Sequence, residues 1–188
     1  MKQGSSNIQQ YAMYFGTYMG IYWILKFILF PLSFKIPFLS FLFVGLTLGV
    51  PFMGYYYLKI YRDKACGGII SFRKAFAFTF LVYMFAAMLA AVAHFIYFQF
   101  IDHGAIYLAM ETQIKVLLEV NEGSADYNSL EDTFKEALDY MAGLTPTDIT
   151  LDNLSRNTFI GIILAIPTAL IGERNTTREK YTLTTVAS

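Results

Sequence analysis

The sequence runs from Ala75 to Ile101 without a single formal charge, as AFAFTFLVYMFAAMLAAVAHFIYFQFI. A helix needs roughly 20 predominantly apolar residues to cross the hydrocarbon core of a bilayer, and this run is longer than that. Composition agrees, because 56% of the 188 residues are hydrophobic and only 15% are charged, whereas a soluble domain carries about 25% charged residues. The run therefore predicts a transmembrane helix at about residues 75–101.

Two apolar runs before it predict two more spans. The first covers about residues 11–32, and we expect Pro31 to end it, because proline cannot continue a helix without losing a hydrogen bond. The second covers about residues 37–57, with a kink expected at Pro51.

A fourth span is predicted at about residues 151–172. Its apolar core, from Thr158 to Gly172, is short for a bilayer and crosses it only if Leu151 and Leu154 extend the helix outward. The chain is therefore expected to be all-α, a single domain built as a bundle of four transmembrane helices.

Basic residues predict the orientation of the bundle, because lysine and arginine accumulate in cytoplasmic loops near span ends. The loop between the first two spans has only Lys35. The bases on the opposite side lie between spans two and three and in the tail, residues 173–188: Lys59, Arg62, Lys64, Arg73, Lys74, Arg174, Arg178 and Lys180. Both termini are therefore expected in the cytoplasm.

An acidic segment separates the third and fourth spans. We call residues 102–150 of this segment the insert. Eleven of the 14 acidic residues lie between residues 102 and 157: Asp102, Glu111, Glu119, Glu122, Asp126, Glu131, Asp132, Glu136, Asp139, Asp148 and Asp152. This composition suits a water-exposed extracytoplasmic region.

Two amphipathic helices are predicted inside the insert. One would share the apolar face Ile106, Met110, Ile114 and Leu117, and the other the face Leu130, Phe134, Leu138 and Met141. We expect Ser129 to cap the second helix and Gly143 to end it. Thr145, Pro146 and Asp148 then indicate a new helix that could run on into the fourth span.

Small residues recur four apart on every span. They are Gly16 and Gly20, Gly45 and Gly49, Ala86 and Ala90, Ala87 and Ala91, and Gly161, Ala165 and Ala169. Such residues let helices approach closely in lipid. Packing within one chain is the favoured interpretation, and homodimerisation is the alternative.

Lys26, His94 and Gln99 are the candidates for an intramembrane polar site. Lys26 continues a stripe of tyrosines on the first span that could line a polar pathway: Tyr11, Tyr14, Tyr18 and Tyr22. Ionisable groups at membrane depth often mark function. However, the apolar part of each span lacks a carboxylate to share a proton with His94, so interhelical hydrogen bonding by a neutral His94 is the favoured interpretation.

The chain shows no motif for catalysis or for a cofactor. It contains neither G-x-S-x-G nor H-E-x-x-H, and Gly67-Gly68 lacks the flanking pattern of a nucleotide loop. Asp102 and His103 are too few for a metal site, and a net charge of zero without a basic stripe gives no indication of nucleic acid binding. We therefore expect a protein that is not an enzyme and has no cofactor.

The stretch YRDKACGGIISFRKAF, residues 61–76, can be interpreted in two ways. Its bases suit a membrane anchor, since a base near anionic headgroups contributes about 1 kcal/mol. Alternatively, the stretch is a contact site for a partner or for lipid, made by Arg62, Asp63, Lys64, Arg73 and Lys74.

The same stretch resembles the signature of a family of Bacteroidetes inner-membrane proteins known as domain of unknown function 4199. The matching residues are Tyr61, Arg62, Asp63, Gly67, Gly68, Ile70, Ser71, Phe72, Ala75 and Phe76, and IYFQFID at residues 96–102 is similar to the family's exit from its third span. The resemblance implies four spans and a diderm bacterial source, and it implies no activity.

Two functions are compatible with these features. The first is a non-catalytic accessory or assembly factor of the bacterial inner membrane, with membrane lipids around it and a membrane-protein partner in the envelope machinery. The resemblance implies a membrane-associated glycosyltransferase as one such partner. The alternative is a small oligomeric transporter or channel, with Lys26, His94 and Gln99 near its path.

Overall fold

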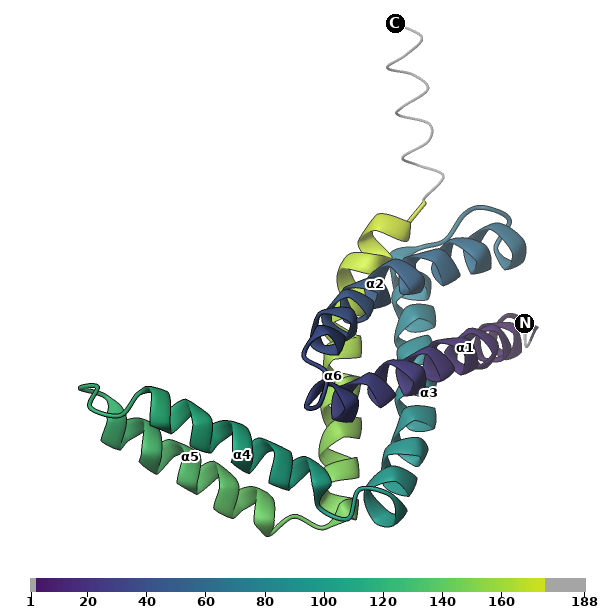
Figure 1. Ribbon diagram of the computed structural model, residues 1–188. Helices are drawn as coiled ribbons and strands as arrows, with labels where there is room; N and C mark the ends of the chain where they lie inside the picture. Colours follow the sequence, from purple (N-terminus) through teal and green to yellow (C-terminus); the bar gives the residue numbers. More distant parts are fainter. Residues whose placement is uncertain (1–2, 175–188) are drawn as a thin grey trace, which may run out of the picture. The chain divides into compact units, whose positions relative to one another are not determined.

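The computed structural model describes residues 3–174, with side chains from residue 8 onward. Within these residues the chain forms six α-helices (Figure 1). The four that are long and apolar enough to cross a membrane are α1 (Gln3–Ser33), α2 (Phe38–Ala65), α3 (Phe72–Phe100) and α6 (Pro146–Gly172). The shorter α4 (Ala105–Val120) and α5 (Tyr127–Ala142) lie between α3 and α6 in the sequence. The predicted all-α class with four spans and a helical insert is confirmed.

The first two helices continue beyond the predicted ends of their spans. Pro31 does not end α1, which continues to Ser33 and is closed by bonds from the amides of Lys35 and Ile36 to the carbonyl of Leu32. A proline in the last turn of a helix removes only one hydrogen bond, so the helix can outlast it. The second helix runs beyond residue 57 to Ala65, so the bases near its end lie on the helix and not in a loop.

The start of α6 explains how the fourth span becomes long enough. The amide of Asp148 donates to Oγ1 of Thr145 over 3.2 Å, and Oδ2 of Asp148 accepts from the amide of Thr145 over 3.0 Å. This reciprocal pair satisfies amides that a helix start leaves open. The predicted start at Pro146 is confirmed, and α6 has 27 residues, or about 40 Å of helix.

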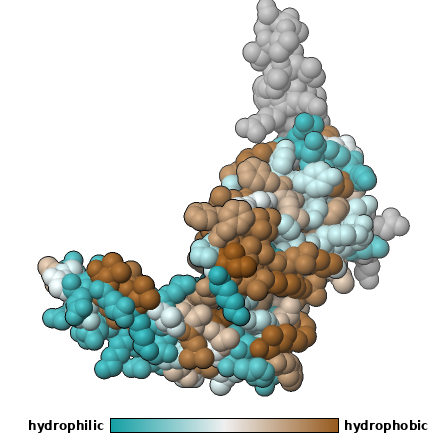
Figure 2. Space-filling view, viewed as in Figure 1, coloured by the Kyte–Doolittle hydropathy of each residue, from teal (hydrophilic) through white to brown (hydrophobic). Residues whose placement is uncertain are grey.

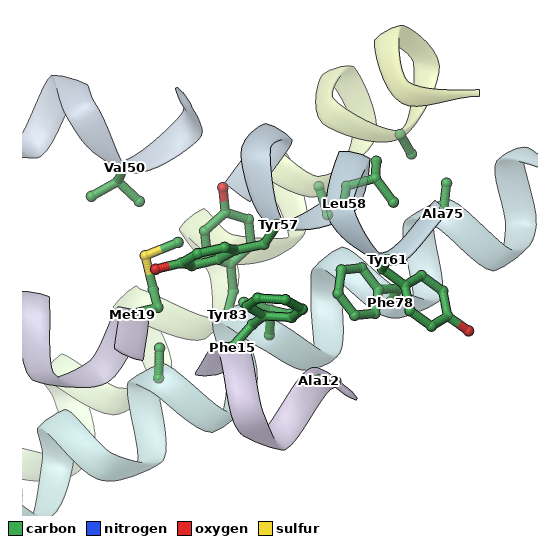
Figure 3. Close-up of a cluster of buried hydrophobic side chains, with 14 of the residues drawn as sticks. Ala12, Phe15, Met19, Val50, Tyr57, Leu58, Tyr61, Ala75, Phe78 and Tyr83 are labelled. Carbon is green, nitrogen blue, oxygen red and sulfur yellow. The ribbon is translucent and has the colours of Figure 1, made fainter. Parts of the chain in front are cut away.

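The described helices belong to two compact units. Unit 1 comprises Met1–Ala90 and Leu154–Ser188, and unit 2 comprises Ala91–Asn153. The core of unit 1 is rich in aromatic side chains (Figure 3). Phe15 of α1 stacks on Tyr57 of α2 with ring centroids 4.7 Å apart, and Tyr61 of α2 stacks on Phe78 of α3 at 4.2 Å. These ring pairs join three helices.

Several small residues of unit 1 allow close helix contacts. A Cβ atom added to Gly16 would lie 2.6 Å from Cβ of Phe85, and one added to Gly20 would lie 2.9 Å from Cδ2 of Leu89. On α6, a Cβ atom added to Gly161 would lie 2.9 Å from Cβ of Tyr83. These contacts are within one chain, as the favoured interpretation predicted. Gly45 differs, because a Cβ atom there would meet open space.

Unit 2 contains a hairpin in which α4 and α5 lie side by side (Figure 1). The predicted apolar face of α5 is the less exposed one, and Gly143 follows the last residue of the helix, as expected. Two details of the prediction were wrong. Ser129 does not cap α5, because the helix already begins at Tyr127. Leu117 was predicted on the covered face of α4, but it is 47% exposed, and Leu118 has the more covered position.

Asp102 shapes the turn between α3 and α4. Its carboxylate accepts hydrogen bonds from the amides of Gly104 over 3.1 Å and of Ile106 over 3.2 Å. Gly104 has a φ of 82°, which suits glycine, and His103 has a φ of 45°. The carboxylate therefore holds a sharp turn directly after the third span.

Candidate functional site

The candidate site is the end of unit 1 where α2 meets α3. α2 ends at Ala65, and the amides of Cys66 and Gly68 both donate to the carbonyl of Arg62. Gly67 and Gly68 have φ angles of 65° and 84°, a left-handed conformation that glycine adopts at little cost. The predicted turn at the glycine pair is confirmed.

Arg62 faces inward at this end. Its side chain is 4% exposed, and its Nε donates to Oδ1 of Asp63 over 2.8 Å. Its Nη1 donates to the carbonyl of Gly172, the last residue of α6, over 3.2 Å. The carbonyls at a helix C-terminus lack intrahelical partners and carry partial negative charge, which a guanidinium complements. Arg62 therefore joins α2 to the end of α6.

A backbone contact also fastens the loop between α2 and α3 to the segment just after α6. The amide of Ile70 donates to the carbonyl of Arg174 over 3.0 Å, and the amide of Arg174 donates back to Ile70 over 3.1 Å. The side chain of Ile70 is buried in the core of unit 1. The loop between α2 and α3 is thus held by hydrogen bonds from two directions.

The exposed charges at this end form a basic surface, which we call the basic end. Its cations come from α2, α3 and the residue that pairs with Ile70: Lys59, Lys64, Arg73, Lys74 and Arg174. Lys74 places its Nζ 5.7 Å from the centroid of the Tyr61 ring. Asp63 is exposed beside them and within electrostatic reach of Lys59 and Arg174. The basic end suits an anionic surface.

The residues that the sequence predicted to contact a partner or lipid differ in their exposure. Asp63, Lys64, Arg73 and Lys74 are exposed, whereas the guanidinium of Arg62 is used inside the protein. The role of Arg62 depends on Gly172, which is 110 positions away in the chain. No local pattern reveals such a pairing. Arg178 and Lys180, also counted on this side, lie outside the described residues.

The three intramembrane candidates do not form one site within either unit. Lys26 belongs to unit 1, where it is half-buried with its Nζ 5.2 Å from the Phe43 ring centroid and 5.9 Å from that of Trp23. His94 and Gln99 lie on α3 in unit 2, where His94 is buried and Gln99 is exposed. The last two therefore project from different sides of their helix.

The tyrosine stripe of α1 is likewise split. Tyr14 and Tyr18 are exposed on the outside of unit 1, with their hydroxyls 3.3 Å apart. Tyr22 instead donates to the carbonyl of Leu46 on α2 over 2.7 Å. The four tyrosines thus serve as an outward surface and as a link between helices, not as one continuous lining.

Four apolar helices joined by short loops and one helical insert define a multi-pass membrane protein. The chain belongs to the family described as protein of unknown function DUF4199, whose model matches residues 14–174. The matched range includes the fastened loop of the candidate site and the whole helical insert. No curated protein and no solved structure matches the chain significantly.

Proposed function

We propose that this protein is a non-catalytic accessory or assembly factor of the bacterial inner membrane. In this account the basic end and both termini lie in the cytoplasm, and the α4–α5 hairpin lies outside. The basic end then binds an acidic surface of a membrane-protein partner in the envelope machinery. Its cations also lie beside the anionic headgroups of the inner leaflet.

The observation that carries the proposal is the fastened loop beneath the basic end. Hydrogen bonds between Ile70 and Arg174 hold the backbone between α2 and α3, and the bond from Arg62 to Gly172 holds the end of α2. Lys64, Arg73 and Lys74 are exposed beside them. The fixed loop keeps the cations at the end of α2 and the start of α3 in a defined arrangement. A fixed loop reduces the entropy that is lost when a partner binds.

Purification of tagged protein from gently solubilised native membranes tests the proposal, with co-purifying proteins read by mass spectrometry. The test variant is Lys64→Glu with Arg73→Glu, which reverses two exposed charges of the basic end. The matched control is Lys35→Glu with Lys135→Glu, which changes net charge equally at exposed positions elsewhere. Arg62 is left intact, because its replacement would disturb the fold.

We expect a stoichiometric partner with the natural chain and the control, and at least tenfold less of it with the test variant. Double charge reversal at one surface removes the complementarity that stabilises such a complex. Equal recovery of the partner with the test variant would contradict docking through the basic end.

A small oligomeric transporter or channel is the second candidate function. Lys26 favours it, because a half-buried cation inside a span often marks a path for ions or substrates. The same purification separates the candidates. Recovery of the protein alone, or only with itself, would contradict the accessory function and favour transport.

A further inference from the structure

The two outer faces of the α4–α5 hairpin differ in chemistry. At 100° per residue, one arc of α4 holds only uncharged residues, of which Ile106 is buried and Ala109 is half-buried: Ala105, Ile106, Ala109, Thr112, Gln113, Val116, Leu117 and Val120. The face of α5 turned away from α4 holds Glu131, Asp132, Lys135, Glu136 and Asp139, all exposed. Figure 2 shows a hydrophobic patch on the hairpin near the end where α4 finishes.

The charges of α4 gather on a single flank of the helix. Glu111 and Lys115 form an ion pair of 2.8 Å there, and the carboxylate raises the pKa of Lys115 through this hydrogen bond. Glu119 lies on the same flank. The remaining arc of α4 is therefore free of charge, and we call its exposed apolar side chains, Val116, Leu117 and Val120, the apolar stripe.

The apolar stripe is not covered by the rest of unit 2. Val120 is 79% exposed, Val116 55% and Leu117 47%. Leu108 is also exposed, but it lies on the charged flank of α4, between Lys115 and Glu119. Apolar side chains grouped on one side of a helix, with acids on the other side of its hairpin, mark a surface that meets an apolar phase.

The connection to α3 identifies that phase as lipid. Phe100 and Ile101 end the third span with exposed apolar side chains, and α4 begins at Ala105, after the turn held by Asp102. The first turn of α4 is thus within a few residues of the bilayer surface. With 16 residues, α4 measures about 24 Å, too short to span a bilayer of about 30 Å but long enough to lie along its surface.

We propose that α4 is an interfacial helix whose apolar stripe enters the bilayer surface at the end of the third span. Val116, Leu117 and Val120 then contact acyl chains, and the acids of α5 face water. The stripe has no basic residue, so its attachment needs no anionic lipid. This inference does not depend on a partner at the basic end.

Electron paramagnetic resonance of the full chain in phosphatidylcholine vesicles tests the proposal. Cys66 is replaced by serine, and a nitroxide is attached to Val120→Cys or, as a second stripe position, to Val116→Cys. The matched control is Glu136→Cys on the outer face of α5. Power saturation then compares each label's collisions with oxygen, which enriches in lipid, and with a nickel chelate, which stays in water.

We expect the ratio of oxygen to nickel collisions to be several-fold higher at residues 120 and 116 than at residue 136, at a depth of about 5–10 Å. The same ratio should persist when anionic lipid is added. A label at residue 120 that meets the nickel chelate as freely as residue 136 would overturn the proposal. A label shielded from both reagents would also overturn it, because protein and not lipid would then cover the stripe.

Discussion

Nη1 of Arg62 donates a hydrogen bond over 3.2 Å to the carbonyl of Gly172, which ends the last transmembrane helix. The two residues are 110 positions apart. The contact places the one buried arginine of the described residues at the C-terminus of α6, where the helix carbonyls carry partial negative charge. It ties α2 to the end of α6.

Replacing Arg62 by alanine is expected to destabilise the fold. The substitution leaves the carbonyl of Gly172 without its donor, and hydrogen bonds to charged groups contribute about 1.5–3 kcal/mol. Arg62→Lys should restore little of this, because an ammonium cannot serve both Asp63 and Gly172 with the geometry of a guanidinium. Unfolding in mixed micelles of increasing dodecyl sulfate content measures the change.

Lys64→Ala is the control for this experiment. Lys64 is exposed on the same turn of α2, and surface substitutions usually change stability by less than about 0.5 kcal/mol. Equal stability of the Arg62→Ala and Lys64→Ala chains would contradict the structural role of Arg62.

Two glycines of α2 should respond in opposite ways to alanine. A Cβ atom on Gly54 would collide with the hydroxyl and Cζ of Tyr83, so Gly54→Ala should cost about 1–3 kcal/mol through overpacking. A Cβ atom on Gly45 would meet nothing within 4 Å. Gly45→Ala should therefore be neutral or stabilise the helix by up to about 1 kcal/mol. The same micelle unfolding compares the two chains, and a similar loss in both would contradict the packing of α2 against Tyr83.

The turn after the third span should loosen when Asp102 becomes alanine. Its carboxylate accepts from the amides of Gly104 and Ile106, and a capping carboxylate of this kind stabilises a helix start by about 1 kcal/mol. Hydrogen exchange of these two amides should quicken several-fold. His103→Asn should leave exchange unchanged, because asparagine tolerates the left-handed φ of 45° at that position. Unchanged exchange in Asp102→Ala would show that the carboxylate does not hold the turn.

Local sequence signals, each contained in one short segment, predicted most of the fold. The uncharged run that became α3, the glycine pair between α2 and α3, and the Thr145–Asp148 start of α6 are local signals, and each is present in the structure. The prediction at the end of α1 was wrong because proline is usually a sign that a helix ends, whereas the apolar residues around it favour a continuing helix. Pro31 looked like a helix end, yet the last turn of α1 tolerates it.

The candidate site was less accessible to sequence reasoning, because its parts are distant in the chain. The charge pattern identified the basic loop, but the burial of Arg62 depends on Gly172, and the position of Ile70 depends on Arg174. The position of Leu117 was also mispredicted because it depends on packing against another helix. Its spacing fits the covered face of α4, and only the packing of α5 shows that Leu118 lies there instead.

Thiol labelling of two single-cysteine chains tests the central claim most directly, namely that the basic end is cytoplasmic and the hairpin is outside. Both chains carry Cys66→Ser. One adds Lys64→Cys at the basic end, and the other adds Ser124→Cys between α4 and α5, and both positions are exposed. A membrane-impermeant maleimide is applied to spheroplasts before and after permeabilisation. We predict that residue 124 is labelled in sealed spheroplasts and that residue 64 is labelled only after permeabilisation. Labelling of residue 64 in sealed spheroplasts, with residue 124 protected, would contradict the account.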